Sequence, residues 1–118
     1  MSQPTYRARR TDPVTSHLAA VGTPGRVSQR NRILLGYALA NRWSLTDEQA
    51  AEEAGVSPRS CWWKRCSELR ELGHIAPLRN EDGLIHVMSS QGKQVMTSMI
   101  TPAGKQYLRS EGLLDPTN

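Results

Sequence analysis

Residues 44–60, SLTDEQAAEEAGVSPRS, contain the pattern that decides the fold. Thr46 followed three positions later by Gln49 matches a capping box, in which the two residues exchange hydrogen bonds at a helix start. Two acidic residues come directly after Thr46, where a helix N-terminus favours negative charge. The pattern predicts a helix of about eight residues, DEQAAEEA, that stops at Gly55.

Three residues at fixed spacing predict that a second helix crosses the first. A helix-turn-helix needs a small residue at the crossing, a glycine in the turn and an apolar residue just after it. Ala51, Gly55 and Val56 supply these residues. Ser57 and Pro58 are typical of an N-cap and a first helical turn, so we expect the second helix to begin there.

The second helix is predicted to run to Leu72, with Gly73 at its C-terminal cap. At about 100° per position, one side carries Trp62, Cys66, Leu69 and Leu72, with Cys61 at its edge. We expect that side to pack into the core, Trp62 included. Arg65 falls among these apolar residues, and we expect it to extend outward or to pair with Glu52 or Glu53.

Two helices are predicted before this motif. Asp12 and Pro13 suit the start of a short helix, and a longer one from Ser28 carries Ile33, Leu34 and Tyr37 at helical spacing. The longer one is the best candidate for a central core helix.

Beyond Gly73 the periodicity changes to short β-leaning runs separated by turn formers. They predict a β-hairpin whose last strand, residues 94–100, alternates between two faces. Thr101 and Pro102 then cap a closing helix. We therefore expect a mainly α fold with a small β-hairpin (α+β), a winged helix-turn-helix. The expected organisation is a flexible basic arm over 1–10, one domain over 11–112 and a tail over 113–118.

Composition narrows the class of protein. At 118 residues the chain suits one domain, and no apolar run approaches the length needed to span a membrane. We expect a cytoplasmic protein that does not bind membranes. Cys61 and Cys66 lie five positions apart on one predicted helix, which turns them away from each other and disfavours a disulfide.

Positive charge is concentrated in two stretches, although the net charge is only +4. Residues 1–32 carry six Arg against one acidic residue, and residues 57–79 carry five Lys or Arg against two Glu. The stretch between them, 33–56, is acidic. Such segregation suits a surface that faces a polyanion, although a solvated basic face would look the same.

The segments SLTDEQAAEEAGVSPRS, KRCSELRELGHI and MITPAGKQYL together resemble the winged helix-turn-helix of MarR-type regulators and of small actinobacteriophage DNA-binding proteins. The resemblance covers roughly residues 28–110, and the opening RRTDPVTSHLAA is similar to N-terminal segments of those phage proteins. It implies the fold and DNA binding. MarR-type regulators are usually longer, with dimerisation helices at both ends, whereas this chain has only short predicted flanking helices.

The opposite side of the second helix is the candidate DNA-binding surface, because the N-terminal end of such a helix usually enters the major groove. Arg59 and Lys64 suit guanine edges or phosphates, and the serines suit phosphate or water. Trp63 lies at the boundary with the apolar side, where it could cover a sugar-phosphate edge or stack on a base. The candidates on this helix are Ser57, Arg59, Ser60, Trp63, Lys64 and Ser67.

Two further segments could reach the minor groove. The hairpin tip SSQGK, residues 89–93, offers Lys93, and the arm offers Arg7, Arg9 and Arg10. A plain turn and a solubilising tail explain the same residues.

Enzyme activity is not predicted. His17, His74 and His86 lie on different elements and form neither a zinc spacing nor a triad. His74 follows a helix end, where a cation is favoured for structural reasons. No phosphate-binding glycine loop is present, so we expect no cofactor and no metal.

The leading hypothesis is a sequence-specific double-stranded DNA-binding protein that represses transcription by occupying an operator. The alternatives are a winged-helix adaptor that engages a host or phage protein, and an architectural factor in recombination or replication. A homodimer stays open, with Leu108, Leu113 and Leu114 as candidates for its interface.

Overall fold

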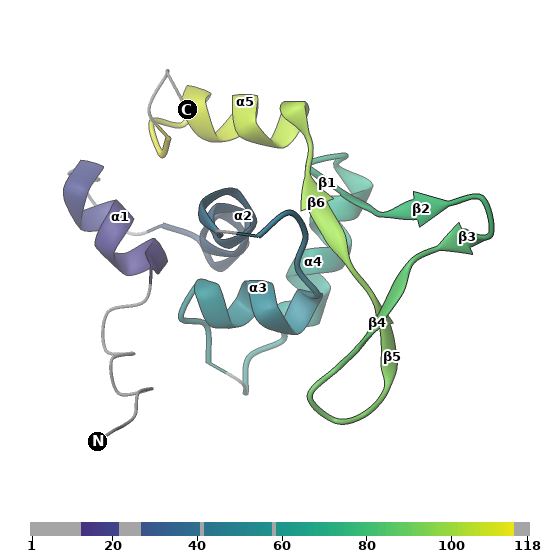
Figure 1. The fold of residues 1–118 in the computed structure, drawn as a ribbon. Helices are drawn as coiled ribbons and strands as arrows, with labels where there is room; N and C mark the ends of the chain where they lie inside the picture. The colour runs from purple at the N-terminus through teal and green to yellow at the C-terminus, as the bar shows by residue number, and fades with distance from the viewer. Residues whose placement is uncertain (1–12, 22–26, 41, 58, 115–118) are drawn as a thin grey trace.

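The computed structural model describes residues 13–21, 27–40, 42–57 and 59–114. The predictions for the arm residues Arg7, Arg9 and Arg10 and for the cap at Asp12 lie outside these ranges. Within them are five helices: α1 (Pro13–Val21), α2 (Gln29–Leu39), α3 (Asp47–Glu53), α4 (Trp62–Glu71) and α5 (Pro102–Ser110). Figure 1 shows α2 at the centre, with the other helices around it and the strands extending to one side.

Helix α2 is the core helix that its apolar spacing predicts. Its start is fixed by Ser28, whose Oγ accepts the Asn31 N–H at 3.1 Å. Ile33, Leu34 and Leu35 are fully buried, and α2 contacts the four other helices and the strand Ser98–Ile100. The remaining elements fold around this helix.

Helix α3 begins with the predicted capping box. Thr46 Oγ1 accepts the Gln49 N–H at 3.1 Å, and Gln49 Oε1 accepts the Thr46 N–H at 3.0 Å. The helix ends before Gly55, which adopts a left-handed conformation with φ of 68°. That conformation turns the chain toward α4, and glycine adopts it with little conformational strain.

The predicted start of the second helix at Ser57 is wrong, because α4 begins at Trp62. Ser57 Oγ accepts the Arg59 N–H at 3.1 Å, while its carbonyl accepts both the N–H and the hydroxyl of Ser60. These bonds tie Arg59 and Ser60 back to Ser57 in a separate turn, and Cys61 after it has a non-helical backbone. The serine therefore caps a turn, and the chain needs four more residues before the helix begins.

The C-terminal end of α4 follows the prediction except at Leu72. Gly73 is left-handed with φ of 79°, and the His74 N–H bonds to the Leu69 carbonyl at 2.9 Å. Cys66 and Leu69 are buried as expected, and Trp62 is half-buried against the core. Leu72 was expected in the core but is 52% exposed, since it lies at the cap where the chain leaves the helix.

Residues 75–100 form the wing, which is built from three antiparallel pairs. The pairs are β1 (Ile75–Pro77) with β6 (Ser98–Ile100), β2 (Arg79–Asn80) with β3 (Gly83–Leu84), and β4 (His86–Met88) with β5 (Gln94–Met96). The predicted last strand is thus interrupted at Thr97. Thr97 and Ser98 are both buried, so the predicted alternation of faces fails there.

Helix α5 closes the core, with Thr101 Oγ1 accepting the Gly104 N–H at 3.1 Å as its cap. Leu108, Leu113 and Leu114 are buried in the same cluster as Ile33. They were candidates for a dimer interface but serve the interior of a single chain. Helices and short antiparallel strands in this order confirm the predicted fold class, a winged helix-turn-helix.

Candidate nucleic-acid interface

The outer face of α4 carries the side chains expected there. Lys64, Ser67 and Glu71 are exposed, and Trp63 is 49% exposed. Within the described ranges Lys64 makes no ion pair. The face therefore offers a free ammonium group and an aromatic surface, while its contact with DNA stays a prediction.

The turn before α4 places its predicted residues unequally. Ser57 and Arg59 are exposed, whereas Ser60 is half-buried and its hydroxyl already donates to the Ser57 carbonyl at 2.7 Å. A phosphate oxygen accepts hydrogen bonds and cannot donate them. In this conformation Ser57 and Arg59 can donate to a phosphate, and Ser60 Oγ cannot.

The tip of the wing folds back toward α3. The Ser90 hydroxyl lies 3.0 Å from both carboxylate oxygens of Glu48, in the first turn of α3. The turn itself is closed by the Ser89 N–H, which donates to the Lys93 carbonyl at 2.7 Å. Lys93 is exposed at this tip and makes no ion pair with any described residue.

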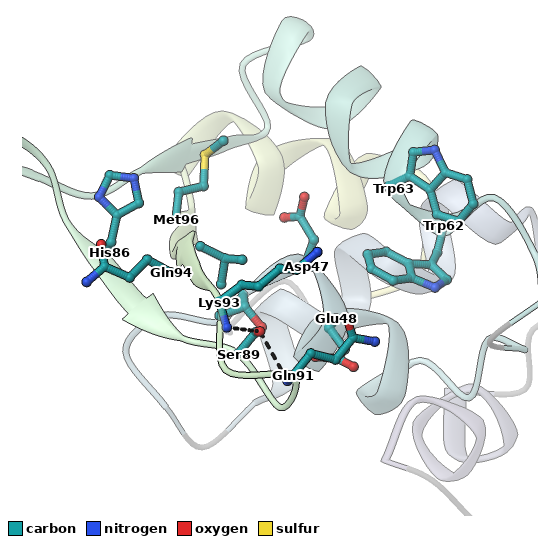
Figure 2. A pocket seen from close by; sticks show the side chains of 12 residues that line it. Asp47, Glu48, Trp62, Trp63, His86, Ser89, Gln91, Lys93, Gln94 and Met96 are labelled. Atoms are coloured by element: carbon teal, nitrogen blue, oxygen red, sulfur yellow. Dashed lines mark hydrogen bonds between the residues drawn. The ribbon is translucent and has the colours of Figure 1, made fainter.

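A groove of about 550 Å³ separates the wing from α3 and α4. Figure 2 shows the tryptophans of α4 on one side, the wing residues on the other and two carboxylates between them. Of the predicted site residues, the groove brings together Trp63 and Lys93. Its lining comprises Thr46, Asp47, Glu48, Trp62, Trp63, His86, Ser89, Gln91, Lys93, Gln94, Val95 and Met96.

A partly buried ion pair fixes α4 against α3 beside this groove. Arg70 binds both carboxylate oxygens of Asp47, at 2.9 and 2.8 Å, and Tyr37 of α2 donates to the same carboxylate at 3.0 Å. The hydrogen bonds from Arg70 to Asp47 raise the pKa of the guanidinium. Two-pronged geometry of this kind is among the stronger polar contacts in proteins, so the orientation of α4 is set by side chains from three helices.

Burial also determines the protonation of the groups beside this pair. Desolvation, and secondly the charge of Asp47, raise the pKa of Tyr37 above its ordinary value and that of the Cys66 thiol to about 12. Since the thiolate is the reactive form, Cys66 acts as an apolar core residue. Cys61 is a free, exposed cysteine.

Arg65 pairs within its own helix and not with the preceding one, which corrects the expected partners Glu52 and Glu53. Its guanidinium lies 3.0 Å from Glu68, which also lies 3.4 Å from Arg30 of α2. Two arginines, one from α2 and one from α4, thus share a single carboxylate.

His74 is not the helix-end cation that its position suggested. Its ring stacks on Tyr107 at 4.8 Å, and desolvation, helped by the charge of Arg30, lowers its pKa. His17 instead bonds through Nε2 to the Leu113 carbonyl at 2.6 Å. Across the described ranges no group of three or more His, Cys, Asp or Glu is placed to hold a metal ion. None of the helices there is long and apolar enough to cross a membrane.

Sequence reasoning did not find the groove or the ion pair beside it. From the sequence, Asp47 and Glu48 are expected as favourable charges at a helix start and as part of an acidic helix that would repel DNA, and Arg70 is not singled out. Arg70 lies 23 positions from Asp47 along the chain. The only sequence signal of such pairing is that residues 57–79 carry an excess of positive charge, whereas residues 33–56 carry an excess of negative charge.

Comparison with known proteins finds similarity to solved structures of transcriptional regulators. No protein-family model matches the sequence, and no curated protein matches it. A probable transcriptional regulator from Pseudomonas aeruginosa is 14% identical with a TM-score of 0.49, the match covering 92% of this chain and 74% of that one.

Two further solved structures are similar to the chain. A MarR-family regulator from Silicibacter pomeroyi is 16% identical with a TM-score of 0.48, over 91% of this chain and 63% of that one. The PcaV transcriptional regulator from Streptomyces coelicolor, solved with its natural ligand, is 16% identical with a TM-score of 0.49, over 92% and 74%. At these identities the likeness concerns the fold alone.

Proposed function

We propose that the protein binds double-stranded DNA and regulates transcription. The observation that carries this proposal is the placement of uncompensated cations. Arg30, Arg65 and Arg70 pair with carboxylates inside the molecule. Arg59, Lys64 and Lys93 are exposed and pair with no described residue. These three lie before α4, on α4 and on the wing, the elements that approach DNA in this fold.

In the proposed complex the N-terminal half of α4 enters the major groove. Arg59 and Lys64 donate to guanine edges or phosphates, and the Ser57 hydroxyl donates to a phosphate. Ser67 and Trp63 lie on the same face, and Lys93 approaches the adjacent minor groove. Occupation of an operator by this surface would repress transcription by blocking access to the promoter.

Titration of a labelled duplex library by fluorescence anisotropy tests the proposal. We expect affinity to fall steeply between about 50 and about 200 mM salt, because cations on the protein release counterions from DNA. Lys64→Glu and Arg59→Glu should each weaken binding by about tenfold or more, and Lys64→Ala should reduce the salt slope by about one.

Lys105→Glu is the matched control, since Lys105 is exposed on α5, on the other side of α2 from α3 (Figure 1). It makes the same charge change and should leave affinity close to wild type. Unchanged binding by both the Lys64 and Arg59 variants would refute the assigned surface.

An adaptor that engages another protein is the second candidate. The half-exposed Trp63 lines the same groove as Glu48, which forms no ion pair with any described residue, and phosphate would be repelled by that carboxylate. Absence of any duplex complex at about 50 mM salt, together with a stable stoichiometric protein partner, would favour this function.

A further inference from the structure

The groove between the wing and α4 has the size and walls of a small-molecule site. Its volume of about 550 Å³ lies within the range of pockets that hold drug-sized ligands. Trp62 and Trp63 have ring centroids 5.6 Å apart and planes at 83°, so they form two walls of a corner. Val95 and Met96 of the wing add apolar surface on the opposite side.

The two carboxylates in the groove differ in their charge balance. Asp47 is neutralised by the two-pronged contact from Arg70. Glu48 receives only the Ser90 hydroxyl and makes no ion pair within the described part of the chain. Beside the aromatic corner the groove therefore carries the Glu48 carboxylate, while the Lys93 ammonium lines it from the wing.

We propose that this groove binds a small organic cation, an aromatic amine or quaternary ammonium compound. The cationic group lies between Glu48 and the ring faces, because a cation is attracted both to a carboxylate and to the face of an indole ring. The apolar body of the ligand packs against Val95 and Met96. This site is a property of the free protein and does not depend on DNA binding.

Lys93 provides a second test of the proposal, because its positive charge lines the same groove. A cationic ligand is repelled by Lys93 and attracted by Glu48, whereas an anionic ligand behaves in the opposite way. Removal of each charge must therefore shift the affinity for a cation in opposite directions.

The test is a tryptophan-fluorescence and calorimetric titration with benzyltrimethylammonium, benzyl alcohol and benzenesulfonate. It uses the full chain with Trp43→Phe, since Trp43 is 74% exposed, lies outside the groove and would add background emission. We expect the ammonium compound to bind about tenfold more tightly than the alcohol, and the sulfonate to bind weakest. Glu48→Gln, which keeps an acceptor for Ser90, should weaken cation binding about fivefold, and Lys93→Gln should strengthen it about twofold.

Glu52→Gln is the matched control, since it removes the same charge from an exposed position of α3 outside the groove. It should leave the affinity unchanged. Equal affinity for the three compounds overturns the proposal, as does an unchanged affinity in Glu48→Gln or a weaker one in Lys93→Gln. Loss of duplex binding in Lys64→Glu with cation binding intact separates this site from the DNA-binding surface.

Discussion

At the scale of single residues, Asp47 is the carboxylate on which three elements depend. It belongs to α3, accepts two bonds from Arg70 of α4 and one from Tyr37 of α2. Arg70 Nη1 also lies 3.4 Å from Ser98 Oγ of β6. The helix-turn-helix and the wing thus share one polar contact point, and the stability of each depends on the same charge.

Asp47→Asn should lower the free energy of unfolding by about 2 to 3 kcal/mol, because it leaves the largely buried Arg70 without its counter-charge. Urea unfolding followed by circular dichroism measures this loss. Arg70→Met in the same background should recover part of it, since the stranded charge is then removed. Two fully additive effects would show that the pair is not coupled.

His74 gives the stability a pH dependence. Because desolvation lowers its pKa in the folded chain, the unfolded chain binds the proton more readily. The contribution of neutral His74 is complete above about pH 6.5 and is lost as the pH falls toward the depressed value. His74→Phe keeps the ring on Tyr107 and should show a smaller drop in unfolding free energy between about pH 7.5 and about pH 5. An identical drop in both proteins would contradict this assignment.

At the scale of elements, the close approach of α2 and α3 depends on Gly36. A Cβ added there would lie 2.8 Å from the Ala50 carbonyl oxygen and 3.3 Å from Glu53 Cβ. Gly36→Ala favours the helix by up to about 1 kcal/mol but forces the two backbones apart. We expect a net destabilisation of about 1 to 3 kcal/mol, measured by thermal and urea unfolding.

Ser67→Ala on the exposed face of α4 is the comparison for that change, with an expected effect within about 0.5 kcal/mol. If Gly36→Ala were as stable as wild type, the crossing of α2 and α3 would be looser than the structure has it.

Element boundaries show how far local sequence signals reach. Capping residues Thr46 and Thr101 predicted two helix starts correctly, because their hydrogen bonds span only three positions. The start at Ser28, predicted from apolar spacing, is fixed by a bond of the same span. Ser57 carries the same kind of signal, yet its oxygen atoms are used in a separate turn. A cap signal is equally compatible with a single turn and a helix, and the sequence does not separate the two.

At the scale of the whole molecule, the chain after α5 returns to close the core over α1. Leu113 and Leu114 are buried, and the Leu113 carbonyl meets the ring of His17. Near the end of a sequence such leucines look like a tail or an interface. Their burial depends on contacts with α1 almost a hundred positions away, which no local pattern records.

Leu113→Ala should therefore lower the unfolding free energy by about 2 to 5 kcal/mol, the usual cost of removing a buried leucine side chain. The midpoint of its thermal unfolding should not depend on protein concentration, because the leucine serves one chain's interior. Thermal unfolding recorded at several protein concentrations, for the wild type and the variant, checks this. If the thermal-unfolding midpoint rose with protein concentration in the wild type but not in Leu113→Ala, these leucines would belong to a dimer interface.

The candidate interface was predictable in part. Exposure of Lys64 and Ser67 follows from helical spacing alone, and the structure agrees. The groove formed by Trp63, Glu48 and Lys93 required the wing to fold back on α3, which depends on the Ser90 hydroxyl meeting Glu48. Contacts between turns far apart in sequence have no periodic signature.

The division of the wing into three short strand pairs has a consequence for its motion. The pair β1–β6 is anchored to the core by two hydrogen bonds between Leu45 and Ser98, whereas β4–β5 beyond it consists mostly of exposed residues. Amide protons of β4 and β5 should therefore exchange with solvent far faster than those of α2, through local opening that leaves the core folded. The outer wing would act as a cooperative unit of its own and rearrange without unfolding the domain.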